Sequence, residues 1–161
     1  MNTIKKITFT LTLVFVFQCV THAQHTNIWK DGRLTFVTKT LVDSEGDEDE
    51  TSYDAGNDDV GINMEIIDYS EVSRMYLNPE FSSSQGCIDM QTELKRKGGS
   101  FYNAYKSYYS VCYDKDYDEY IINAVIHRDD TEKIYDIALY CYNITIDEGL
   151  EVLKSITFLD K

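Results

Sequence analysis

The chain has 161 residues, of which 43% are hydrophobic and 13% aromatic, and this composition is typical of one compact domain with a packed core. Its 28 acidic residues outnumber its 15 Lys and Arg, so the formal net charge is −13. This charge argues against binding to nucleic acid or to anionic lipid, because affinity for phosphate groups comes from Lys and Arg.

Residues 1–23 have the pattern of a secretory signal peptide. Two lysines precede an apolar run over residues 7–17, and small side chains stand before Gln24. The run is shorter than the roughly 20 residues that span a bilayer. We therefore expect cleavage after Ala23 and a secreted or periplasmic protein that is not an integral membrane protein. Lipid attachment at Cys19 is the less favoured alternative.

The first half of residues 24–161, which we expect to form a single domain, contains two strand regions separated by an acidic segment. Residues 27–42 suit an opening hairpin that turns at Gly32. Residues 43–59 are rich in Asp and Glu and predict a solvated loop, which is favoured over a calcium site because the EF-hand register fails. Residues 60–69 alternate like a half-buried strand.

Two helical segments are expected next. Residues 70–77 have a helix-like pattern that ends before Pro79. Residues 82–97 can start on a capping serine and end in a basic cluster before two glycines, which is typical of a helix whose carboxyl end is complemented by cations.

The second half of the chain predicts an antiparallel meander and a closing helix. Residues 101–113, 120–128 and 133–143 are rich in Tyr, Ile and Val and are separated by Asp-rich turns. Thr145 and Glu148 form a capping box before an apolar helical stripe. The expected fold class is α+β, with helices packed on an antiparallel sheet.

Four segments carry a resemblance to a known family. They read GINMEI at 61–66, YIINAVI at 120–126, IYDIALYC at 134–141 and LKSITF at 153–158. Their order resembles the PsbP-like family of α/β/α sandwiches. The resemblance implies a small non-enzymatic adaptor or binding protein. Trp29 lacks the neighbouring proline that the family usually has, so no site residue is carried over.

Three cysteines remain after the signal peptide, namely Cys87, Cys112 and Cys141. In an oxidising compartment one disulfide and one free thiol is the simplest arrangement, and all three pairings stay open. Strand direction mildly favours Cys112 with Cys141, unless an intervening strand separates them. Three buried thiols are the structural alternative.

No catalytic, cofactor or metal motif is present, so we expect no enzyme, no cofactor and no metal. The chain lacks a G-x-S-x-G, an H-E-x-x-H, a C-x-x-C and a phosphate-binding glycine loop. The histidines beyond the signal peptide are His25 and His127, so few residues of this type could act as a catalytic base.

Tyrosines are the most unusual feature of the sequence. Five of them crowd residues 102–113, and Tyr102 and Tyr108 are the candidate partner-binding residues, with packing as the alternative explanation. The preferred hypothesis is an exported acidic protein that binds a basic protein, such as an inhibitor or immunity-type protein of the cell envelope. A small hydrolase with paired carboxylates and a structural envelope subunit are the alternatives.

Overall fold

The computed structural model describes residues 24–43 and 50–159. The signal-peptide prediction therefore lies outside the described residues. The strands are β1 His25–Trp29, β2 Leu34–Thr38, β3 Ser52–Gly56, β4 Val60–Asp68, β5 Glu93–Lys97, β6 Lys106–Asp114, β7 Glu119–Arg128, β8 Lys133–Cys141 and β9 Thr157–Phe158. The helices are η1 Tyr69–Glu71, α2 Pro79–Asp89 and α3 Ile146–Lys154.

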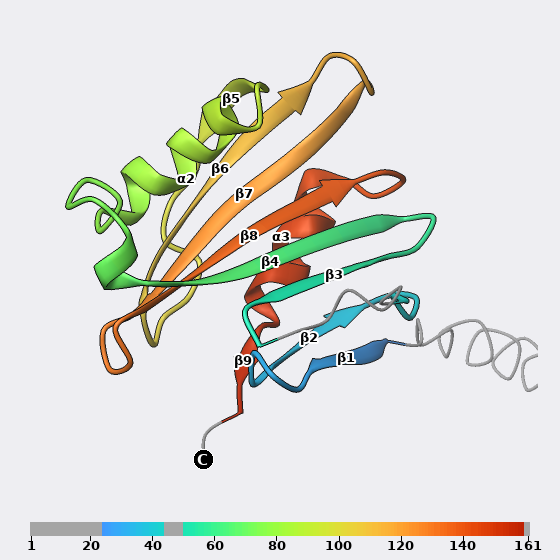
Figure 1. Ribbon diagram of the computed structural model, residues 1–161. Helices are drawn as coiled ribbons and strands as arrows, with labels where there is room; N and C mark the ends of the chain where they lie inside the picture. The colour runs from blue at the N-terminus through green and yellow to red at the C-terminus, as the bar shows by residue number, and fades with distance from the viewer. Residues whose placement is uncertain (1–23, 44–49, 160–161) are drawn as a thin grey trace, which may run out of the picture.

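The strands form two antiparallel sheets. The larger has the order β3-β4-β8-β7-β6-β5, and the smaller has the order β1-β2-β9. Helix α2 packs on one face of the large sheet, over β5, β6 and β7, while α3 and the small sheet lie on the opposite face (Figure 1). The predicted α+β fold with helices on an antiparallel sheet is confirmed. Among the described residues no helix is both long and apolar enough to cross a bilayer.

The main core lies between the large sheet and the layer formed by α3 and the small sheet. Strand alternation directs Ile62, Ile122 and Leu139 into it, and Trp29 and Phe36 enter from the small sheet. Strand β7 is buried on both faces because a helix covers each of them. That residues 24–161 fold as a single domain stays a prediction.

The prediction of a solvated loop over residues 43–59 is wrong for residues 52–56, which form strand β3. Tyr53 and Ala55 point inward, with 4% and 5% of their surface exposed, and Asp54 points outward. The Tyr53 ring stacks on Trp29 with the ring centroids 5.7 Å apart. Burial of this aromatic side chain against a distant tryptophan favours a strand in a segment whose local composition favours a loop.

The second predicted helix, over residues 82–97, is also wrong in its bounds. Asn78 caps α2 by accepting hydrogen bonds from the backbone N–H groups of Glu80 and Phe81, and Pro79 occupies the first helical position. After α2 ends, Gln91 has a φ of 59° and reverses the chain into β5. The basic cluster therefore lies on an edge strand, and the helix predicted at 70–77 is only the short turn η1.

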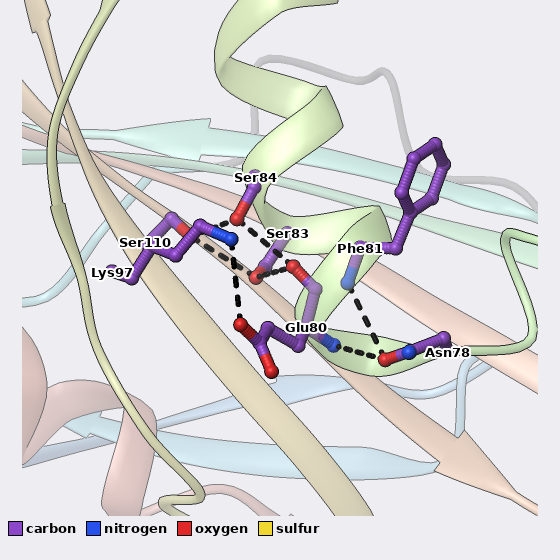
Figure 2. A network of polar contacts seen from close by, with 7 residues as sticks. All are labelled: Asn78, Glu80, Phe81, Ser83, Ser84, Lys97 and Ser110. Atoms are coloured by element: carbon purple, nitrogen blue, oxygen red, sulfur yellow. Dashed lines mark hydrogen bonds and ion pairs between the residues drawn. The ribbon is translucent and has the colours of Figure 1, made fainter.

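Helix α2 packs on the sheet largely through polar groups (Figure 2). The Ser110 Oγ from β6 lies 3.1 Å from Ser83 Oγ and 3.2 Å from Ser84 Oγ. Asn123 of β7 donates from Nδ2 to the Ser83 carbonyl at 3.1 Å. A Cβ at Gly86 would lie 1.9 Å from Asn123 Nδ2, so glycine is required for this close approach. With few apolar contacts of its own, α2 depends on these specific bonds for its position.

Removing the capping box of α3 should lower the free energy of unfolding by about 1 kcal/mol. Thr145 Oγ1 accepts from Glu148 N at 3.2 Å, and Thr145 N donates to Glu148 Oε2 at 2.8 Å. Thr145→Ala loses the first of these bonds, whereas Thr145→Ser retains it. Urea denaturation of both variants measures the difference. Equal losses in the two variants would show that methyl packing, and not the cap, stabilises this end of α3.

Candidate functional site

Among the described residues, no helix lies over one half of the α2 face of the large sheet. Because α2 packs over β5, β6 and β7, the strands β8, β4 and β3 are left without a described helix on that face (Figure 1). The strand register directs Asp54, Glu65 and Asp136 to this open half, one from each of these strands. The open half therefore collects carboxylates from segments that are far apart in the sequence.

Two adjoining hollows run along the open half, with volumes of about 520 Å³ and 310 Å³. They share Asn63 and Tyr140 and together form what we name the acidic groove. Its carboxylates are Asp43, Asp54, Glu65, Asp89 and Asp136, and no Lys, Arg or His within residues 24–43 and 50–159 lines either hollow. Asp89 comes from the end of α2, so the helix forms one wall of the groove.

The groove carboxylates have no ion-pair partner within the part of the chain that the structure describes. The described lysines and arginines that form ion pairs do so with other acids, such as Glu80, Glu93 and Asp129. Glu65 and Asp136 face each other directly on β4 and β8. Like charges in such a cross-strand pair destabilise a sheet, so the arrangement is not explained by fold stability.

Asp136 is the least satisfied of these groups. Its Oδ1 is inaccessible to solvent and has no hydrogen-bond partner in the described structure. Burial, and to a smaller extent the charges of Glu65 and Asp89, raise the pKa of this carboxyl to about 6, although a hydrogen bond from the backbone N–H of Ile137 to the carboxyl acts in the opposite direction. The base of the groove therefore holds a carboxylate that is ionised at neutral pH at a cost to the folded state.

Tyrosine rings form the other end of the groove. The rings of Tyr140 and Tyr142 stack with centroids 6.2 Å apart. A Cβ at Gly61 would lie 2.6 Å from the Tyr142 hydroxyl, so glycine is needed beneath that ring. Burial and the charge of Asp54 raise the pKa of Tyr140. The groove thus combines negative charge with flat aromatic surfaces, which suit cationic side chains.

A disulfide between Cys87 of α2 and Cys112 of β6 fixes the helix that forms the groove wall. The preferred pairing of Cys112 with Cys141 is therefore wrong. Strand β7 lies between the strands that carry these two residues, and two strand spacings of about 4.8 Å exceed the distance that a disulfide can bridge. Cys141 is a free buried thiol, and burial raises its pKa to about 12.

The predicted partner-binding tyrosines are not brought together. Tyr102 stacks on Tyr105 and contacts Phe158 beside the main core. Tyr108 lies on β6, directly opposite Val125 of β7. Neither residue lines the acidic groove, and their role in partner binding stays a prediction.

The hollow between β2 and α3 and the buried His127 are weaker candidates for a functional site than the groove. A hollow of about 470 Å³ between β2 and α3 has charged groups that already pair with one another, as in Lys39 with Glu148 and Lys154 with Glu151. His127 is buried beneath the ring of Tyr69. No group of three or more His, Cys, Asp or Glu among the described residues could hold a metal ion.

Comparison with known proteins shows a likeness in fold. No protein-family model and no curated protein matches the sequence. The crystal structure of the Ran-binding protein Mog1p from Saccharomyces cerevisiae matches with a TM-score of 0.58 and 9% identity over 87% of this chain and 97% of that chain. A structure of a Mog1 mutant matches with a TM-score of 0.56 and 9% identity over 86% and 97%.

These matches correct several expectations. The resemblance to the PsbP-like family is wrong, because the two solved structures named above are those of Mog1. The likeness to a Ran-binding protein also contradicts the expected exported inhibitor or immunity-type protein of the cell envelope. The secreted or periplasmic localisation is contradicted with it.

Proposed function

We propose that the chain is a protein-binding domain that holds a positively charged segment of a partner protein in the acidic groove. One observation carries the proposal: five carboxylates line a groove into which the described part of the chain places no cationic side chain. A solved structure that shares the fold is that of a Ran-binding protein, which supports a protein as the partner.

The groove supplies both parts of such an interaction. Asp54, Glu65 and Asp89 are exposed and attract cations over distances comparable to the Debye length. The stacked rings of Tyr140 and Tyr142 offer a rigid surface on which a guanidinium group can lie. Charge steers the partner toward the groove, and contact with the rings stabilises the complex.

A labelled octapeptide of alternating Arg and Ser tests the proposal by fluorescence anisotropy. We expect the intact protein to bind it, with lower affinity at about 300 mM than at about 50 mM salt. The triple variant Asp54→Asn/Glu65→Gln/Asp89→Asn neutralises exposed groove acids and should weaken binding by about 10-fold or more.

The matched control neutralises three exposed acids outside the groove, in the variant Glu71→Gln/Asp116→Asn/Glu132→Gln. It has the same net charge as the groove variant and should bind within about 2-fold of the intact protein, since it changes only distant, screened charges. Equal weakening by the two triple variants, or no binding by the intact protein, would overturn the proposal.

A further inference from the structure

The smaller hollow of the groove has the character of a pocket for one side chain. It measures about 310 Å³ and lies between the end of α2 and the strands β4, β8 and β7. Glu65 and Asp136 lie on adjacent strands at its base, and Asp89 faces them from the helix. Met90 and the Tyr140 ring supply apolar surface at its sides.

The unpaired oxygen of Asp136 is a second observation, besides the clustered charges, that points to a donor at this hollow. Asp136 Oδ1 has no accessible surface and no hydrogen-bond partner among the described residues, whereas the side chain as a whole is half-buried and lines the hollow. Buried carboxylate oxygens are ordinarily paired, because an unpaired one destabilises the fold. A retained exception next to a second carboxylate is typical of a site that a ligand completes.

From this geometry, and building on the proposed function, we infer that the hollow is an anchor pocket for a single arginine side chain of the partner, with the guanidinium group between Asp136 and Glu65. A guanidinium carries five N–H donors in a planar fork and can donate to two carboxylates at once. Its stem would then lie along Met90 and its plane beside Tyr140.

Other cations fit the hollow less well. The three carboxylates are not arranged to bind a metal ion. A lysine ammonium is a compact, strongly hydrated charge that loses more hydration on entry and lacks the fork needed to engage both acids. No Lys, Arg or His among the described residues lines the hollow, so no described side chain competes with an incoming cation.

The test compares single variants with two peptides, the Arg-Ser octapeptide and its Lys-Ser counterpart. Asp136→Asn should weaken binding of the arginine peptide by about 10-fold, whereas Asp54→Asn, which removes an equal charge from the open end of the groove, should weaken it by about 2-fold. For the lysine peptide, Asp136→Asn should have an effect of about 3-fold or less. The carboxyl carbon resonance of Asp136 should also shift on addition of the arginine peptide.

The failure of this inference can be distinguished from failure of the proposed function. Equal effects of Asp136→Asn and Asp54→Asn, equal effects on the two peptides, or an unmoved Asp136 resonance would overturn the anchor pocket while the triple-variant result still supports the groove. Indifference of binding to the triple groove variant would overturn both. Circular dichroism and thermal denaturation of Asp136→Asn establish that the variant is folded.

Discussion

Replacing Asp136 with asparagine should raise the free energy of unfolding at pH 7 by up to about 3 kcal/mol. Burial raises the pKa of this carboxyl from 3.8 to about 6, and each pKa unit corresponds to about 1.4 kcal/mol. Asparagine keeps nearly the same shape without the charge. A substitution that strengthens the fold while weakening peptide binding is the behaviour expected of a residue retained for function.

The raised pKa of Asp136 determines how its contribution to the stability of the fold changes with pH. A proton on Asp136 stabilises the folded state, so this contribution is complete below the unfolded pKa of 3.8 and is lost as the pH rises through about 6. The gain from Asp136→Asn should therefore be full above pH 7 and vanish near pH 4. Urea denaturation of both proteins across this range measures it.

Other titrating groups near Asp136 do not obscure this comparison. Glu65 faces it from β4 and Asp89 from α2, and both are present in the two proteins. Burial lowers the pKa of His127, so this histidine reduces the stability of the fold as the pH falls. Because both proteins contain His127, this effect cancels when their free energies of unfolding are subtracted. Asp54→Asn is the control and should leave stability nearly unchanged. A loss of stability in Asp136→Asn at pH 7 would mean that the carboxylate is a structural acceptor.

Loss of the Cys87–Cys112 disulfide should lower the free energy of unfolding by about 3 to 4 kcal/mol. The bond closes a loop with a sequence separation of 25, and this constraint on the unfolded chain accounts for most of the expected effect. The variant Cys87→Ala/Cys112→Ala and the intact protein under reductant should show the same loss on urea denaturation.

The loss should concentrate in α2, whose contacts with the sheet are mainly the polar bonds of Ser83, Ser84 and Asn123. Hydrogen exchange of the α2 amides should therefore accelerate on reduction before that of β7. Cys141→Ala is the control and should still respond to reductant, because Cys141 is not in the bond. An intact protein whose stability is unchanged by reductant would contradict the prediction.

Local patterns in the sequence were sufficient to predict many of the strands and helices. The alternation over residues 60–69 predicted strand β4, and the Tyr, Ile and Val content of residues 120–128 and 133–143 between Asp-rich turns predicted β7 and β8. The capping box at Thr145 predicted the start of α3. These signals succeed because side-chain period and cap chemistry depend on residues a few positions apart.

The features that the sequence misassigned depend on distant contacts. Tyr53 lies in an acidic segment, and its strand is stabilised by Trp29, which lies on another sheet. The helix predicted over 82–97 ends early because the basic residues after it pair with β6 as an edge strand. Composition within a short window cannot report such partners.

The acidic groove also depends partly on local sequence patterns and partly on distant contacts. The alternating pattern of β4 directs Asn63 and Glu65 away from its buried face, and Asp136 is an acidic residue within the otherwise apolar strand β8. The sequence by itself therefore determined that these groups lie on the outer face of their strands. Only the tertiary structure decided that β4 and β8 are neighbours, that α2 covers the other half of the face, and that Asp89 completes the cluster. The physical reason is that side-chain direction is a local property of a strand, whereas strand order and helix placement are set by the packing of the whole chain.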